Sequence, residues 1–396
     1  MKKSLLAVAV AAALPTFAQA QSSITMFGIL DASVEYSDAQ ANSSIAGATQ
    51  AVQRGEDGFR VNSGTQSGSR FGIRGVEDIG GGLKGIFTIE HRLDISTGET
   101  QGGNVFLLPG ATNSSFNNKF WNGQAWVGVE TRFGNITMGR QYTPIFWALL
   151  PADFSGYGFY NNWAGLSGTN VGVASPQGPI RLDNSVSYKS PTMGGLTVWA
   201  TYAFGENLTN NPAGATPGSS TAGSGDVWGV AAGWQLGGLY LAAGYHSIDQ
   251  KAWGTAAGAN TATESVLAAT ASYKFQNFGV SVGYTEIGFK QISGNEPTIS
   301  SILLGAFANL GPGTLFVNAT LLDVSNLNVY STSGTATLAS GGDTLQLGVA
   351  YSIPLSKRTN WYAAYGLNDV SNLQPASAAT KIDGANRFSI GLRHLF

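Results

Sequence analysis

The chain has 396 residues, of which 11% are charged and 11% aromatic, with 54 glycines and no cysteine. The lack of cysteine excludes a disulfide framework and thiolate metal sites, and a formal net charge of −2 gives no indication of nucleic-acid binding. Beyond the N-terminal segment, no apolar run approaches the roughly eighteen residues of a membrane helix.

The N-terminus has the three regions of a secretory signal peptide. A basic start, Lys2-Lys3, precedes an apolar run over residues 5–14, and residues 18–20 (AQA) form a small-x-small cleavage site. The apolar run is too short to span a bilayer. We therefore expect residues 1–20 to be removed. The mature chain, residues 21–396, would carry 19 basic and 23 acidic residues, and nothing in its composition divides it into further domains.

Alternation of apolar and polar residues begins at once in the mature chain. Its clearest instance is residues 83–95, where Leu83, Phe87 and Ile89 share one parity and Glu90 and Arg92 the other. A period of two predicts strands with one apolar and one polar face. A soluble sandwich could show the same pattern. Strands that recur to the end of the chain without helices favour a large transmembrane barrel with a wet lumen, because a closed barrel satisfies every backbone polar group in lipid.

Short and long connections alternate along the chain. Seven short ones carry the Gly, Asn and Pro expected of hairpin turns, and eight longer ones separate them. Tight turns on one rim and long loops on the other are typical of outer-membrane barrels. The sequence therefore predicts an all-β, 16-stranded antiparallel transmembrane β-barrel. The short connections are residues 78–82, 132–135, 190–195, 236–238, 276–279, 309–313 and 354–359.

One long connection, residues 142–180, is unlike the others. It is rich in aromatic residues, and Asp153 is its only charged side chain. A structureless loop of this length is uncommon unless it is functional. We expect it to fold inward, pack inside the barrel and narrow a water-filled pore.

Parity also predicts which charges face the lumen. Phe71 and Ile73 take the lipid-facing parity, so Arg70 and Arg74 point inward. On the strand near residues 181–189, the apolar parity of Leu182, Val186 and Tyr188 places Arg181, Asp183 and Lys189 inward. Many such charges do no more than solvate a lumen.

Five blocks of sequence resemble the general porins of Gram-negative bacteria, of the beta-proteobacterial type. The blocks are residues 23–31 (SITMFGILD), 69–78 (SRFGIRGVED), 139–144 (GRQYTP), 183–188 (DNSVSY) and 391–396 (GLRHLF). The resemblance implies a sixteen-stranded barrel in the outer membrane, in contact with its lipid, a homotrimer, and passive diffusion of small hydrophilic solutes and ions. It also implies that the terminal Phe396 is the signal read by the barrel-assembly machinery.

The same resemblance suggests residues for the pore constriction. It places a basic cluster at Arg70 and Arg181, and an acidic group opposite them at Asp153, in residues 151–156 (PADFSG). Arg74, Lys84 and Arg140 are second choices, near the periplasmic rim. The chain departs from the family pattern at Gly123, where an inward arginine is frequent, and this departure weakens the expected anion preference.

Three functions remain open at this stage. The leading one is a general diffusion channel, with a substrate-selective outer-membrane channel as the alternative and a barrel-borne adhesin or enzyme as the third. His91, His246 and His394 are far apart and lack metal-binding spacing. We therefore expect no catalysis, metal, cofactor or nucleic-acid partner.

Overall fold

The computed structural model describes residues 22–38, 58–100, 119–160, 180–204, 226–249, 261–291, 298–325, 342–369 and 385–396. In these ranges the chain forms seventeen strand segments in one sheet, a short helix and a 3₁₀ turn. The predicted signal peptide, residues 1–20, lies outside the described residues. The elements are β1 (Ser23–Ser37), β2 (Gly58–Ser63), β3 (Arg70–Gly80), β4 (Leu83–Arg92), β5 (Gln124–Thr131), β6 (Gly134–Tyr142), α2 (Pro144–Leu149), η2 (Leu150–Ala152), β7 (Arg181–Lys189), β8 (Leu196–Ala203), β9 (Val227–Leu236), β10 (Leu239–Asp249), β11 (Thr261–Lys274), β12 (Phe278–Gln291), β13 (Thr298–Leu310), β14 (Gly313–Ser325), β15 (Gly342–Pro354), β16 (Thr359–Asp369) and β17 (Ala385–Leu395).

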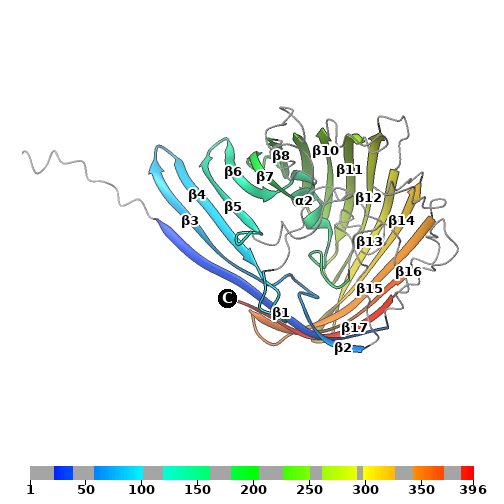
Figure 1. Ribbon diagram of the computed structural model, residues 1–396. Coiled ribbons are helices and arrows are strands. Elements are labelled where there is room, and N and C mark those ends of the chain that lie inside the picture. Colours follow the sequence, from blue (N-terminus) through cyan, green and yellow to red (C-terminus); the bar gives the residue numbers. More distant parts are fainter. Residues whose placement is uncertain are drawn as a thin grey trace, which may run out of the picture.

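The sheet closes on itself as a barrel of sixteen antiparallel strands (Figure 1). Consecutive strands pair around the wall, and β17 pairs with β1 from Ile29↔Leu395 to Ser37↔Arg387. Seventeen segments make sixteen wall strands because β2 and β3 lie end to end along β1: β3 pairs with residues 23–29 of β1 and β2 with residues 32–37. The predicted fold class is confirmed.

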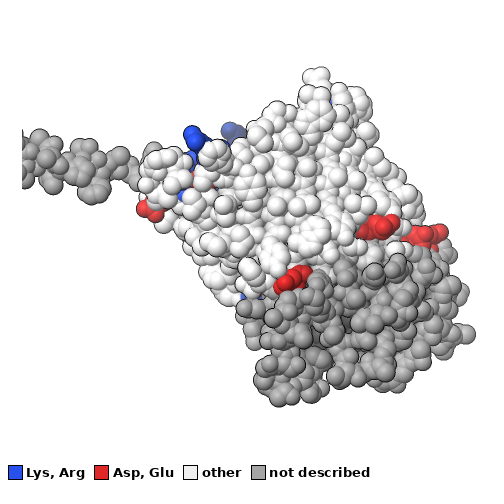
Figure 2. Space-filling view, turned by 90° about the horizontal axis from the view of Figure 1, so that it is seen from above, with Lys and Arg blue, Asp and Glu red and all other residues white. Residues whose placement is uncertain are grey.

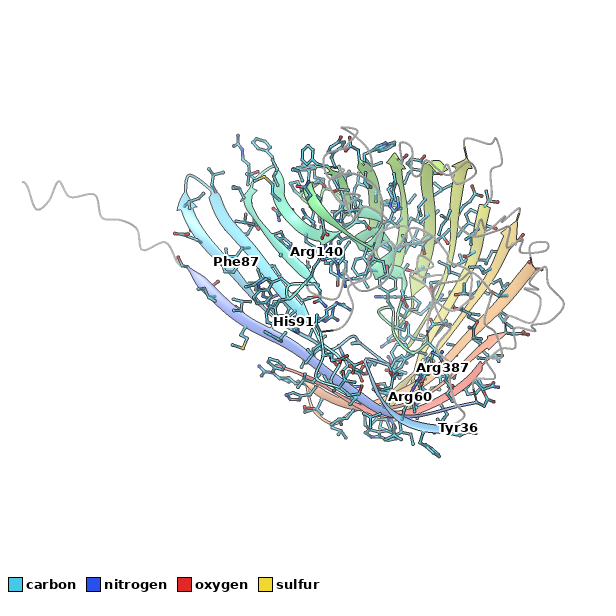
Figure 3. All side chains as sticks on the ribbon, viewed as in Figure 1. Tyr36, Arg60, Phe87, His91, Arg140 and Arg387 are labelled. Carbon is cyan, nitrogen blue, oxygen red and sulfur yellow. The ribbon has the colours of Figure 1, made fainter. Side chains whose placement is uncertain are left out.

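The alternation seen in the sequence appears as two faces of the wall. On β1, Ile24 and Met26 are 76% and 67% exposed on the outside, while Asp31 and Glu35 are completely buried on the inside. Figure 3 shows the same division, with Tyr36 on the outer wall and Arg60 and Arg387 inside. Over most of the face in Figure 2 the outer wall is free of charged residues, which occur toward its edges. An uncharged apolar exterior is what contact with hydrocarbon requires.

All seven predicted short connections are turns between neighbouring strands. Several place a glycine in the left-handed region, such as Gly194, Gly237 and Gly311 with φ of 57°, which costs glycine little because it has no Cβ. The predicted long connections lie largely outside the described residues. Among the described helices, none is long and apolar enough to cross a membrane.

The main apolar core of the described chain lies inside the barrel. The segment that follows β6 turns inward, and Figure 1 shows α2 within the ring of strands. Its buried residues pack against the inner faces of β9 to β14. The polar inner faces of other strands suggest a wall in contact with water. On this side, however, the inner wall is apolar and is covered by the loop.

Candidate pore constriction

Helix α2 begins at a favourable capping sequence. Thr143 precedes it, and its Oγ1 accepts a hydrogen bond from the Phe146 amide at 3.3 Å, with Pro144 in the first turn. Threonine at the cap and proline just after it are both preferred, because the first amides of a helix lack partners within the helix. The inward loop therefore starts as a defined helix directly after β6.

The barrel wall beneath α2 is built from small residues. Ile145 and Leu149 are fully or almost fully buried, and they pack against Ala242 and Ala268. A Cβ added at Gly244 would meet the Cγ1 atom of Ile145 at 2.9 Å, so glycine there lets the helix approach the wall. Burying each large apolar side chain stabilises the folded state by about 1.5–3 kcal/mol. This contact holds the first half of the loop against β9, β10 and β11.

The second anchor of the loop lies on the opposite part of the wall. Phe159 is completely buried against β14, β15 and β16, beside Phe316 and Tyr362. Gly348 of β15 and Gly366 of β16 face each other in the sheet. A Cβ on Gly348 would lie 2.3 Å from the Phe159 carbonyl oxygen, and one on Gly366 would lie 2.6 Å from the Tyr160 ring. The two glycines thus form a slot for this part of the loop.

Tyr160 connects the loop to β1. Its hydroxyl donates to Glu35 Oε2 at 2.7 Å and also bonds to Ser389 on β17. Glu35 is buried and pairs with Arg60 of β2. Burial and the hydrogen bond to Glu35 both raise the pKa of Tyr160 above its usual value. The hydroxyl therefore remains a donor, and the anchor persists over the physiological pH range.

A second segment that turns into the barrel contacts the loop near Phe159. Residues 64–69, between β2 and β3, leave the ladder, and the amides of Gln66 and Ser67 donate to Asp31 Oδ2 at 2.8 and 2.6 Å. The Phe159 amide donates to the Thr65 carbonyl at 2.7 Å. The described loop is thus fixed on several walls of the barrel, which leaves the side formed by β3, β4 and β5 uncovered by α2.

Arginines gather on that uncovered side around one phenol. The Nη2 atoms of Arg181 and Arg92 donate to the Tyr142 hydroxyl at 2.6 and 3.2 Å, and the Arg181 guanidinium lies 4.3 Å from the centroid of the Tyr142 ring. Arg70 lies within electrostatic reach of Arg92, Tyr142 and Glu90. Glu90 pairs with Arg92 at 3.4 Å. Glu90 is thus the carboxylate that the described contacts place among these three guanidinium groups.

The register of the first hairpin explains why two arginines meet. Arg70 of β3 stands directly opposite Arg92 of β4, and both are on the inward parity. Arg181 arrives from β7, where it pairs with Tyr142 at the end of β6. The structure therefore brings Arg70 and Arg181 to the same phenol.

Arg140 belongs to a neighbouring ion-pair group. Its Nη1 donates to Asp183 Oδ1 at 2.6 Å, its Nε donates to the Asn122 carbonyl at 2.9 Å, and Lys119 also pairs with Asp183. It lies two residues before the end of β6 that leads into the loop, so its predicted position near the periplasmic rim is wrong. The prediction that Leu182 faces lipid is also wrong. It is buried in a cluster with residues of β8, β9 and β10, because the ladder is irregular beside Asn184, whose φ is 51°.

The carboxylate of Asp153 accepts hydrogen bonds from its own turn. Oδ1 accepts from the amide and hydroxyl of Ser155 at 2.9 and 2.8 Å, and Oδ2 accepts from the Tyr157 amide at 2.7 Å. The ring of Tyr157 contacts Phe146, which stacks on Tyr142 at 3.9 Å between centroids. A row of aromatic rings therefore leads from the turn at Asp153 to the arginines. The opposition of Asp153 to Arg70 and Arg181 that the sequence suggested stays a prediction.

Arg74 and Lys84 lie away from this cluster. Arg74 is exposed on the inward parity of β3, near the Phe27 ring at 5.6 Å. Lys84 is the second residue of β4, next to a short turn, and pairs with Glu130 of β5 at 2.9 Å. Both residues lie closer than Arg70 and Arg92 to the short turn that joins β3 and β4, and therefore nearer to the short-turn rim.

Comparison with known proteins identifies the family. The sequence profile of the Gram-negative porins matches residues 7–373. The chain belongs to this family. Outer membrane porin protein 32 of Delftia acidovorans is 31% identical over 323 residues, which cover 78% of this chain and 77% of the relative. A porin of Bordetella pertussis is 30% identical over 212 residues, 52% of this chain and 49% of the relative.

Solved structures agree with this assignment. The anion-selective porin from Comamonas acidovorans has a TM-score of 0.68 and 25% identity, covering 95% of this chain and all of that one. The protein is therefore an outer-membrane porin that forms a diffusion channel, and it is not an enzyme.

Several contacts in this porin's lumen are not predicted by the sequence. Arg92 was assigned to the inward face but not to the cluster, although the β3–β4 hairpin register would have placed it opposite Arg70. The sequence places Tyr142 and Tyr160 in the aromatic-rich connection but does not predict their bonds to Arg181 and Glu35. No local pattern reveals these contacts, because each joins segments far apart in the chain.

Proposed function

We propose that the inward loop and the arginines around Tyr142 form the narrowest part of the channel, and that Arg70 and Arg181 act there on passing ions. Support comes from the loop's anchors, which hold it against β9 to β11 and β14 to β16 and leave passage beside β3 and β4. Arg74 contributes further along the pore, whereas Lys84 and Arg140 are held in ion pairs. Asp153, which also accepts hydrogen bonds within its own turn, is the acidic member of the constriction.

We further propose a weak preference for anions among the small hydrophilic solutes that pass. In the part of the chain that the structure describes, Arg70, Arg92 and Arg181 outnumber the carboxylate of Glu90 that lies among them. Selectivity is set where field lines are confined by the walls, so local charge outweighs the net charge of the chain. The solved porin with a TM-score of 0.68 is named as anion-selective, which is consistent with this proposal.

The zero-current potential across a planar bilayer in a potassium chloride gradient tests this assignment. In the Arg70→Gln/Arg181→Gln double variant we expect the potential to shift toward cation preference, because two positive charges leave the constriction while the loop remains anchored. Arg132→Gln is the matched control, since Arg132 stacks on Phe133 in a short turn at the rim. A double variant with the wild-type potential would contradict the proposal, as would an equal shift in the control.

Three further properties follow from family membership and are proposed here. Residues 1–20 act as a cleaved signal peptide, the mature porin is a homotrimer, and the barrel-assembly machinery recognises the C-terminal strand through Phe396. Phe396 exchanges backbone hydrogen bonds with Gly28 at 3.0 and 3.1 Å, so it closes the seam between β17 and β1. N-terminal sequencing of the exported protein and its mass in mild detergent test the first two. Assembly of a Phe396→Ala variant tests the third.

A further inference from the structure

A cavity of about 360 Å³ lies between the tip of the inward loop and the barrel wall. Lys274 at the end of β11, Asn309 near the end of β13 and Thr314 near the start of β14 form one side of it. All three are next to short turns, so the cavity opens toward the periplasmic rim of the barrel. It is separate from the arginines around Tyr142.

The floor of the cavity is aromatic. Phe154 from the loop packs edge-on against Phe307 of β13 with 4.8 Å between ring centroids, and Phe316 of β14 lies beside them. A Cβ on Gly279 would lie 3.0 Å from the Phe154 ring, so glycine there admits this ring to the wall. Three phenylalanine rings in one cavity of a water-filled channel provide apolar surface for a flat solute.

One cation stands at the edge of this floor. Lys274 is exposed, and its ammonium group lies 5.5 Å from the centroid of the Phe154 ring. The Asn309 side chain accepts from Thr314 Oγ1 at 2.9 Å and lies on the same side. Asp153 also borders the cavity, but its carboxylate is directed into the loop, toward Ser155 and Tyr157. Of the two charged residues in the described lining, Asp153 is buried and Lys274 is exposed to a solute.

We propose that this cavity is a binding subsite for aromatic monocarboxylates that have passed the constriction. The carboxylate pairs with Lys274, and the ring lies on Phe307 and Phe316. The negative charge of Asp153 nearby disfavours a second carboxylate on the same solute. This inference rests on the diffusion function only because solutes reach the cavity through the lumen.

Single-channel recording with 3-phenylpropanoate added on the short-turn side tests the subsite. We expect brief current interruptions with wild-type porin and none with acetate, which carries the charge without the ring. Lys274→Gln should raise the half-blocking concentration about tenfold or more, because a hydrogen bond to a charged group is lost. Lys274 is exposed, so this variant is expected to fold.

Lys189→Gln is the matched control. Lys189 is also the last residue of its strand, is exposed, and lies on the inward parity of β7 beside a short turn. It should leave the half-blocking concentration unchanged. An equal effect of both lysine substitutions, or none of Lys274→Gln, would overturn the subsite. Tighter block by phenylalanine, which adds an ammonium group to the same skeleton, would overturn the proposed solute class.

Conductance in potassium chloride separates this inference from the channel function. If wild-type porin conducts but shows no interruptions with 3-phenylpropanoate, only the subsite is wrong. If wild-type porin fails to conduct at all, the diffusion function itself is contradicted.

Discussion

Tyr142 is the residue on which the arginine cluster depends. Its ring stacks on Phe146 at an interplanar angle of 11°, and its hydroxyl accepts from two guanidinium groups. Arg181 is buried, and within the described residues its Nε has no hydrogen-bond partner. The phenol therefore stabilises a cation that would otherwise have little compensation in the wall.

We predict that Tyr142→Phe weakens the cluster while keeping the ring stack. Loss of hydrogen bonds to charged groups should lower the free energy of unfolding by about 1.5–3 kcal/mol. Guanidinium unfolding in detergent micelles measures this change. Tyr202→Phe is the control, because the Tyr202 hydroxyl bonds to Asp226 on the exposed outer wall, where such a bond contributes little. Equal losses in the two variants would contradict the role assigned to Tyr142.

At the scale of elements, the inward loop and the wall are shaped for one another. The wall provides alanine and glycine beneath α2, and the facing pair Gly348 and Gly366 beneath Phe159 and Tyr160. Close packing of this kind tolerates few added atoms, because neighbouring groups relax only in part. The position of the loop is therefore encoded in the strands as much as in the loop itself.

Gly348→Ala tests this complementarity. The added Cβ would fall 2.3 Å from the Phe159 carbonyl oxygen, which is backbone, so the loop must shift. We expect larger current fluctuations in single-channel recordings and faster proteolysis within residues 143–160. The control is Gly85→Ala, whose Cβ has its nearest neighbour, the Glu77 carbonyl oxygen, at 4.0 Å. Wild-type noise in Gly348→Ala would show that the slot does not hold the loop.

At the scale of the whole molecule, the loop both narrows the lumen and covers part of its wall. Val266, Ile287 and Leu303 point inward and are buried beneath it. We predict that replacing residues 144–158 by a short Gly/Ser linker raises conductance and also lowers thermal stability, because these side chains would face water. Each exposed side chain costs about 1.5–3 kcal/mol as an upper estimate. Liposome swelling with sugars of increasing size and thermal unfolding measure the two effects. An unchanged size limit would place the constriction elsewhere.

Strand number, alternation and turn positions were predictable from the sequence because they depend on local patterns. The period of two assigned Arg70 and Arg92 to the lumen, and turn residues located all seven short connections. The lipid-facing prediction for Leu182 was wrong because Asn184, with a left-handed backbone, interrupts the strand pairing. No local sequence signal marks this interruption. The bonds of Asp153 to its own turn were not predictable either. A loop carboxylate gives the same sequence pattern whether it faces a pore or accepts hydrogen bonds from backbone amides.

The seam between β1 and β17 has a consequence for biogenesis. One edge of β1 pairs with β2 and β3, but its other edge pairs with β17, so the ring cannot close before residues 385–396 have been added. A chain that breaks off earlier would present bare edges on β1 and β16 to hydrocarbon, where each unsatisfied backbone group costs several kcal/mol. A truncated chain therefore cannot form a stable barrel in the membrane and remains accessible to proteases. The pairing of β1 with β17 thus selects for chains that carry the last strand.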